Sequence, residues 1–92
     1  MHYEWDPQKA AANERDHEVN FADAVSVLED ESALTREDPD AKDEQRFVTL
    51  GMNALGALLV VVYTYRRPDA IRLISAWKAN KAQRKQYEEK RR

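Results

Sequence analysis

Apolar side chains recur at alternate positions through the second half of the chain, and this spacing is typical of β-strands. Residues 45–53 alternate between apolar and polar or small side chains, whereas residues 58–63 are apolar throughout, which predicts a strand in the core. We expect residues 45–53 and 58–65 to form a hairpin, because turn residues separate them. A further antiparallel strand is predicted over residues 70–77.

Capping residues mark three helices. The dipeptide Asp6-Pro7 predicts a helix over residues 7–16, because Asp accepts hydrogen bonds from free backbone N–H groups and Pro fits the first helical position. A second helix begins at Asn20 and carries one apolar face. Asn80, with Gln83 three residues later, caps a polar helix rich in lysine and arginine.

Two short strands, over residues 2–5 and 32–36, complete the order β-α-α-β-β-β-β-α, with a charged loop over 37–44. This order predicts an α+β fold, an antiparallel sheet with its helices packed mainly on one face. The 92 residues suffice for one domain, so we expect a single domain over 1–92.

Charge is divided between the two halves of the chain. The net charge is −2, yet residues 1–46 hold 14 acidic and 5 basic side chains, against 3 acidic and 10 basic in residues 47–92. This asymmetry indicates either a nucleic acid or a complementary protein as partner. The simpler interpretation is that folding mixes both halves into an ordinary surface.

Several function classes are excluded or disfavoured by composition. The chain has no cysteine, which excludes disulfides, thiolate catalysis and cysteine-based zinc sites. The two histidines have no metal-ligand spacing, so we expect no metal and no other cofactor. The N-terminus does not resemble a secretory signal, and the apolar run near residue 60 is far too short to span a bilayer. We therefore expect a cytoplasmic protein without membrane contact.

The strongest candidate chemistry involves a cation on a predicted core strand. Arg72 lies in the strand over 70–77, where simple alternation places Ile74 and Ala76 on its own face. A buried cation is costly unless it faces a cleft or a partner, and beside a basic helix the expected occupant is a polyanion. Cations and aromatic rings suit RNA cleavage, in which a group activates the ribose 2′-OH, cations stabilise the phosphorane and flat surfaces stack on bases.

Each candidate also has a purely structural interpretation. Arg72 would then pair with a carboxylate, His17 would cap or pack at a helix end, and Lys9 would be a solvated side chain. Trp5 and Tyr63 are most simply core aromatics.

A series of short segments extends along nearly the whole chain. The first is Trp5-Asp6-Pro7-x-Lys9-x-x-x-Asn13-x-x-x-His17-x-Val19-x-Phe21. The others are residues 34–40, 46–51, 59–64 and 72–76, followed by Arg84 and Tyr87-Glu88. No single segment is diagnostic, but in their order and spacing they together resemble the BrnT family of toxins. The sequence departs from the family pattern in three places: Asp16-His17-Glu18 replaces Lys-His-Gly, Trp77 replaces arginine and Gln83 replaces a frequent glutamate.

The resemblance implies a compact RelE-like ribonuclease of a type II toxin–antitoxin system with the same order of elements. It also implies a BrnA-type antitoxin with a ribbon-helix-helix fold, so that operator DNA is contacted only through the antitoxin. We expect this antitoxin to cover the basic face of the toxin.

The leading hypothesis is a metal-independent endoribonuclease toxin that cuts mRNA and inhibits translation. Arg72 is predicted to stabilise the phosphorane, and Lys9, Tyr63 and His17 are candidates for proton transfer or orientation. We predict substrate binding by Lys81, Arg84, Arg46 and Trp77. Because Trp77 replaces a cation, it is also predicted to attenuate the toxin. The alternatives are a non-catalytic RNA-binding module and a protein-interaction domain that uses the same basic face.

Overall fold

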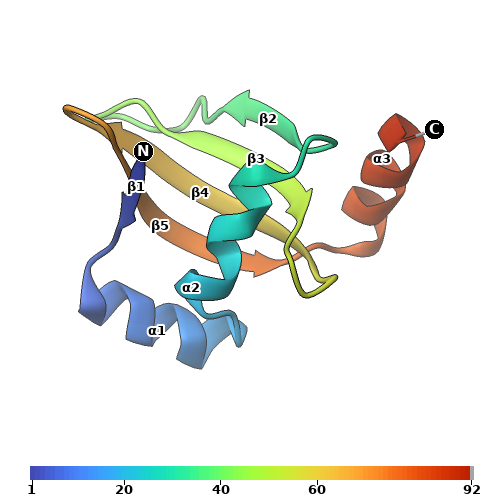
Figure 1. Cartoon of the computed structure of the whole chain (residues 1–92), viewed down its shortest axis with the longest axis horizontal. Coiled ribbons are helices and arrows are strands. Elements are labelled where there is room, and N and C mark those ends of the chain that lie inside the picture. The colour runs from blue at the N-terminus through green and yellow to red at the C-terminus, as the bar shows by residue number, and fades with distance from the viewer. Residues whose placement is uncertain (92) are drawn as a thin grey trace.

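The computed structural model describes residues 1–91; Arg92 lies outside the described residues. A five-stranded sheet in the order β1-β5-β4-β3-β2 forms its centre (Figure 1). The elements, in chain order, are β1 (His2–Glu4), α1 (Pro7–His17), α2 (Phe21–Ala24), the 3-10 helix η1 (Val25–Glu29), β2 (Leu34–Glu37), β3 (Phe47–Met52), β4 (Leu58–Arg66), β5 (Ala70–Lys78) and α3 (Lys81–Arg91). The predicted α+β fold and the predicted order of elements are confirmed, and η1 continues the second helix.

The sheet is mixed, so the prediction of a wholly antiparallel sheet is wrong at one edge. Strands β2 to β5 form the expected antiparallel meander. Strand β1 pairs with β5 in the parallel direction, with Glu4 opposite Arg72. No hairpin joins these two strands, so nothing local in the sequence sets their relative direction.

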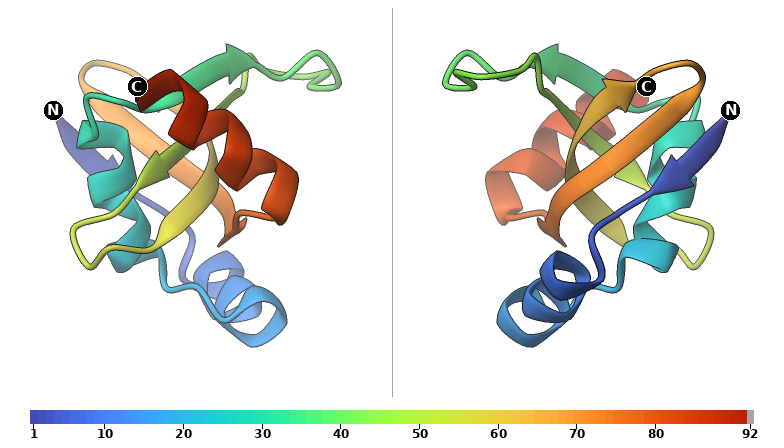
Figure 2. Two further views of the ribbon diagram at one scale, coloured as in Figure 1. Left: turned by 90° about the vertical axis from the view of Figure 1, so that its right-hand side faces the viewer. Right: turned by 90° about the vertical axis from the view of Figure 1, so that its left-hand side faces the viewer.

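Helices lie on both sides of the sheet, with the larger core under α2 and η1. On this side, which we call the α2 face, the core contains Phe21, Val27, Val61 and Leu73. On the opposite side, the α3 face, Tyr87 of α3 packs on a smaller apolar cluster: Leu50, Leu58 and Val60. Figure 2 shows α2 and α3 on opposite sides of the sheet. No helix among residues 1–91 is long and apolar enough to cross a membrane.

A β-bulge interrupts β5 at Ile74. Val62 pairs with Ser75 and the next residue of β4, Tyr63, pairs with Leu73, so Ile74 has no partner in β4. The extra residue shifts the alternation of faces. Ala76 therefore joins the core of the α2 face, and the prediction that it shares a face with Arg72 is wrong.

Local hydrogen bonds explain where the helices begin. The Asp6 carboxylate accepts a hydrogen bond from the Gln8 N–H (2.8 Å), as its capping role predicts. At α3 the capping box is reciprocal: the Gln83 N–H donates to Asn80 Oδ1 (2.8 Å) and the Asn80 N–H donates to Gln83 Oε1 (2.9 Å). These bonds satisfy N–H groups that the first helical turn leaves free.

Candidate functional site

Three of the predicted site residues come together in a groove between α1 and β5. Lys9 and His17 lie two helical turns apart on the same side of α1, and both line a cavity of about 200 Å³ beside the bulge at Ile74 and Ser75. The cavity continues toward Trp77 and Lys78, and the rings of His17 and Trp77 are 6.1 Å apart at 45°. We call this surface the α1–β5 groove; its residues are Lys9, Ala12, Asn13, Asp16, His17, Ile74, Ser75, Trp77 and Lys78.

Asn13 fixes the position of this groove. Its side-chain Nδ2 donates to the carbonyl oxygens of Ala76 (2.8 Å) and Val19 (3.0 Å). Its Oδ1 accepts from the Ala76 N–H (3.0 Å) and from the Ser75 hydroxyl (3.2 Å). The buried amide thus docks α1 against the edge of β5 where β1 has already ended.

Arg72 lies on the α3 face, opposite Thr64 of β4 and directly beside Glu4 of β1. Its Nη1 donates to Glu4 Oε2 at 2.8 Å, and both side chains are about one-third exposed (33% and 37%). The structural interpretation of Arg72, that it pairs with a carboxylate, is therefore confirmed. The remaining guanidinium donors leave Arg72 able to bind an additional anion.

A second arginine flanks Thr64 from the other side. Arg46 directly precedes Phe47, whose partner in β4 is Tyr63, so Arg46 lies next to Thr64 at the end of β3. Its Nε is 3.6 Å from Glu44, and Glu44 also accepts a 2.6 Å hydrogen bond from Arg66. The bond from Arg66 outweighs burial and holds the pKa of Glu44 below its ordinary value. Two of the predicted cations therefore lie in one row across the α3 face.

Tyr63 is not part of either surface. It is 5% exposed, belongs to the core of the α2 face, and shares a 2.8 Å hydrogen bond with the Thr49 hydroxyl. Its ring stacks on Phe47 at 5.9 Å. The structure thus places Tyr63 on the opposite side of the sheet from Arg72. Its position is that of a core aromatic side chain, which was the structural interpretation of this residue.

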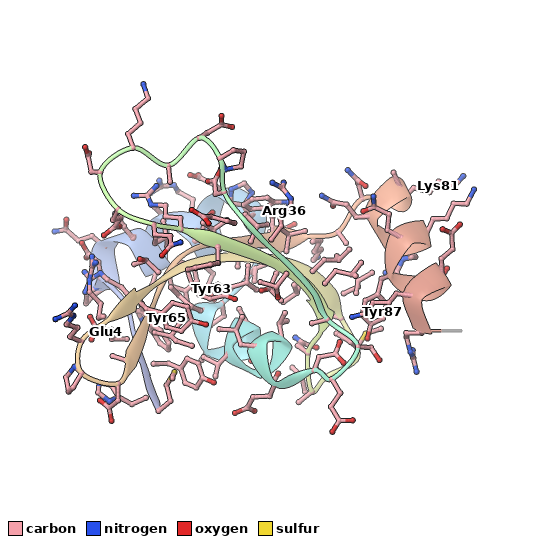
Figure 3. All side chains as sticks on the ribbon, turned by 90° about the horizontal axis from the view of Figure 1, so that it is seen from above. Glu4, Arg36, Tyr63, Tyr65, Lys81 and Tyr87 are labelled. Atoms are coloured by element: carbon pink, nitrogen blue, oxygen red, sulfur yellow. The ribbon has the colours of Figure 1, made fainter. Side chains whose placement is uncertain are left out.

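Lys81 and Arg84 lie apart from the other predicted residues. They line the outer side of α3 together with Lys85 and Glu88. Arg72 is six residues from the end of β5, which corresponds to about 20 Å of strand. In Figure 3, Lys81 and Tyr87 lie at one end of the molecule and Glu4 at the other. These two cations and Arg72 cannot hold the same phosphate.

One hydrogen-bonded carboxylate attaches α3 to the rest of the molecule. Asp30 Oδ2 accepts hydrogen bonds from the Tyr87 hydroxyl (2.6 Å) and the Met52 N–H (2.8 Å), and Oδ1 accepts from the Ser32 N–H (3.0 Å). Burial alone would raise the pKa of Asp30, but these bonds together with Arg91 hold it below its ordinary value. Burial, followed by the bond to Asp30, raises the pKa of Tyr87. We call this set of contacts the Asp30–Tyr87 latch.

The sequence predicted no functional role for Asn13, Ser75 or Gln86, and it predicted only a capping role for Gln83. The spacing of Lys9, Asn13 and His17 at i, i+4 and i+8 was a usable signal for a shared helix face. Nothing in the sequence indicated the bulge that brings Ser75 to this groove. Among residues 1–91, no three His, Asp or Glu side chains are grouped so that they could hold a metal ion.

Comparison with known proteins agrees with this architecture. Residues 5–83 match the family model described as the ribonuclease toxin BrnT of type II toxin–antitoxin systems. The structure is similar to the crystal structure of the Brucella abortus ribonuclease toxin BrnT, with a TM-score of 0.67 and 25% sequence identity over 88% of this chain and 99% of that chain. No curated protein matches the sequence. The fold is that of a type II ribonuclease toxin. The chain belongs to the BrnT family, as its sequence segments predicted.

Proposed function

We propose that this protein is a metal-independent endoribonuclease that cuts mRNA in the cytoplasm and inhibits translation. One observation carries the proposal: Lys9 and His17 of α1 meet Ser75 and Trp77 of β5 in the α1–β5 groove. The groove begins at the bulge, two residues beyond Arg72. It therefore combines cations, an imidazole, a hydroxyl and a half-buried aromatic ring, which are the groups that RNA cleavage requires.

In the proposed mechanism the ribose 2′-oxygen attacks the adjacent phosphorus atom. His17 takes the proton of the 2′-OH, because a neutral imidazole has a ring nitrogen with a free lone pair. The P–O5′ bond breaks and the 5′-oxygen takes up a proton from water, leaving a 2′,3′-cyclic phosphate and a 5′-hydroxyl, while His17 releases its proton to the solvent. Arg72 and Lys9 stabilise the negative charge that develops on the phosphorane oxygens.

The remaining predicted residues bind RNA away from the reacting phosphate. Arg46 lies in the same row as Arg72 and is placed for a neighbouring phosphate. Lys81 and Arg84, on the outer side of α3, would contact the RNA backbone beyond the cleavage site.

Trp77 attenuates the activity in this proposal. Arginine, usual in the family at this position, would add a cation beside His17. Tryptophan supplies a ring that stacks on a base, and base–aromatic stacking contributes about 1–3 kcal/mol. Stacking holds substrate and transition state equally, so binding persists while turnover falls. This substitution is also the observation that favours a non-catalytic RNA-binding function as the second candidate.

The partner in this proposal is a BrnA-type antitoxin with a ribbon-helix-helix fold. Neutralisation requires that RNA be kept from the α1–β5 groove and from Arg72. We therefore expect the antitoxin to cover both, with DNA bound by the antitoxin alone.

The test is incubation of the purified protein with a single-stranded RNA in EDTA, followed by analysis of the product ends. Cleavage that yields 2′,3′-cyclic phosphate and 5′-hydroxyl ends is expected, with loss of products in His17→Ala. Lys42→Ala, in the exposed loop between β2 and β3, is the matched cation control. Cleavage that EDTA abolishes rejects the metal-independent mechanism, and salt-dependent RNA binding without products supports the non-catalytic candidate.

A further inference from the structure

A second cavity lies toward the β2 edge of the sheet, between α3 and the α3 face. Its volume is about 300 Å³, at the lower end of the range of small-molecule sites. Val48, Leu50 and Val60 form an apolar floor on β3 and β4, and Leu34 continues this floor on β2. We call this cavity the α3 cleft; the mechanism proposed above does not use it.

Polar groups surround this floor. Gln83 and Gln86 line the cleft from α3, and Arg36 lines it from β2. The capping box directs the Gln83 carbonyl oxygen to the Asn80 N–H, which leaves the Gln83 Nε2 group as a donor. Arg36 is exposed and forms no ion pair with any of residues 1–91. Gln83 therefore presents a fixed donor to the cleft, and Arg36 makes the charge of the cleft positive.

The wall formed by α3 is held in place. The Asp30–Tyr87 latch ties the middle of α3 to the loop after η1, and Lys90 Nζ donates to the Ala33 carbonyl oxygen at 3.1 Å. The reciprocal capping box fixes the N-terminal turn of the same helix. A cleft with a fixed wall presents its donors in one arrangement, which is a condition for discrimination between ligands.

The α3 cleft is connected to the α1–β5 groove by a row of residues across the sheet. Ser75 pairs with Val62, Val62 with Val48, and Val48 with Arg36. Three strand spacings separate Ser75 from Arg36, a distance of about 14 Å. A single strand of RNA that passes through the groove can therefore reach the cleft along this row.

We propose that the α3 cleft binds one unpaired base of the RNA substrate and selects guanine and uracil, which carry a keto oxygen at C6 or C4 where adenine and cytosine carry an amino group. This proposal rests on the proposed function, because it assumes that RNA is the ligand of the same face. The apolar floor packs against the flat base, as apolar side chains do in other base pockets. The Gln83 amide donates a hydrogen bond to the keto oxygen of the bound base, and Arg36, at the rim of the cleft, binds the phosphate of the same nucleotide.

The donors of the cleft explain the preference. Guanine presents O6 and N7 as acceptors, and uracil presents O4, whereas adenine and cytosine each present an amino group on the corresponding edge. The amino group of adenine or cytosine would face the Gln83 Nε2 group. Both groups are donors, so neither would find an acceptor in the other. Loss of such a hydrogen bond in a desolvated site is costly, so a single fixed donor is enough to discriminate.

The experiment titrates the protein with hexanucleotides that carry 2′-O-methyl groups and therefore lack the attacking hydroxyl. The four probes are hexa-adenylate, hexacytidylate, hexauridylate and an alternating adenylate–guanylate hexamer. NMR signals of the Gln83 and Gln86 side-chain amides and the Val48 methyl groups report on the cleft. The ring C–H signals of His17, which lies on α1 away from the cleft, report on the α1–β5 groove.

We expect the uridylate and the guanylate-containing probes to shift the cleft signals at concentrations at least fivefold lower than the other two probes. Gln86→Ala should weaken this binding, whereas Lys85→Ala, the neighbouring residue on the outer side of α3, should not. Arg36→Ala should reduce the salt slope of binding by about 0.7, the value for one contact to a single-strand phosphate.

The two reporters separate failure of this proposal from failure of the proposed function. If the His17 signals respond while the cleft signals do not, RNA binding stands and the base subsite is rejected. Equal response of the cleft to all four probes rejects base selection. If neither reporter responds to any probe, both the base subsite and RNA binding in the groove are rejected.

Discussion

Asn13 binds Ala76 as a neighbouring β-strand would, because its side-chain amide pairs with both the N–H (3.0 Å) and the carbonyl oxygen (2.8 Å) of that residue. Strand β1 ends at Glu4, so the edge of β5 beyond Arg72 has no strand partner. One side chain of α1 takes over this pairing and also places Lys9 and His17 beside the bulge.

Replacement of Asn13 should therefore destabilise the protein strongly. Asn13→Ala leaves the buried N–H and carbonyl oxygen of Ala76 without partners, and we expect a loss of about 2–4 kcal/mol in the free energy of unfolding. Urea denaturation measures this loss, and Asn20→Ala, an exposed helix cap, serves as the comparison with an expected loss of about 1 kcal/mol. A loss for Asn13→Ala no larger than that of the cap would contradict the strand-like role.

Glu18 occupies a left-handed backbone conformation (φ 58°, ψ 31°) at the end of α1. Glycine adopts this conformation without steric cost, and the BrnT family usually has glycine here. We expect Glu18→Gly to raise the free energy of unfolding by about 0.5–1 kcal/mol. Ala11→Gly, at an exposed position inside α1, should instead lower it by about 1 kcal/mol. Destabilisation by both substitutions would show that the backbone at Glu18 is not strained.

The Asp30–Tyr87 latch predicts a stability that depends on pH. The folded pKa of Asp30 lies below its ordinary value of 3.8, so its contribution is present above that value and is lost as the pH falls through the folded pKa. Tyr87→Phe removes one of the bonds that lower this pKa and should cost about 1–3 kcal/mol at pH 7.

Chemical denaturation between pH 2 and pH 7 checks this prediction. The wild-type protein should lose more stability on acidification than Tyr87→Phe does. Identical pH profiles of the two proteins would show that the hydroxyl does not act through Asp30.

Arg72→Lys should separate stability from activity. Lysine can pair with Glu4 but cannot hold two phosphate oxygens in a planar fork, so we expect cleavage to fall about 100- to 1,000-fold, nearly as far as in Arg72→Ala. Thermal denaturation should show little change in stability. Arg66→Lys, whose partner is Glu44, is the matched control and should retain activity. Full cleavage by Arg72→Lys would reject the bidentate role.

Trp77→Arg tests the attenuation of the toxin. If the ring replaces a cation that catalysis needs, expression of Trp77→Arg without antitoxin should inhibit growth more strongly than expression of the Trp77 protein. Trp77 also packs on the apolar cluster of the α3 face, so the soluble yield of both proteins must be compared. Equal growth at equal yield would show that Trp77 is only a packing residue.

Much of the local structure followed from the sequence alone. Asp6-Pro7 and the pair Asn80 and Gln83 predicted helix starts that the hydrogen bonds confirm, because a cap acts within three residues. The alternation in residues 45–53 and the apolar run over 58–63 predicted the central hairpin, because the two strands and the turn between them are adjacent in the sequence. The family was also readable from the order of short segments along the chain.

The candidate site was only partly predictable. Lys9, His17 and Trp77 were named from the sequence as candidate site residues, and their meeting in one groove depends on the bulge at Ile74 and on Asn13. Lys81 and Arg84 were predicted to bind substrate, and they lie on the outer side of α3.

What the tertiary structure alone decided are the contacts between segments far apart in the chain. The parallel pairing of β1 with β5 and the pairing of Arg72 with Glu4 join residues 68 positions apart, and the bond from Asn13 to Ala76 joins residues 63 positions apart. Which side of a helix or strand meets which partner is set by packing of the whole core, where all such contacts form together. Periodicity and capping act within a few residues, so the sequence by itself determined the elements, and their docking determined the site.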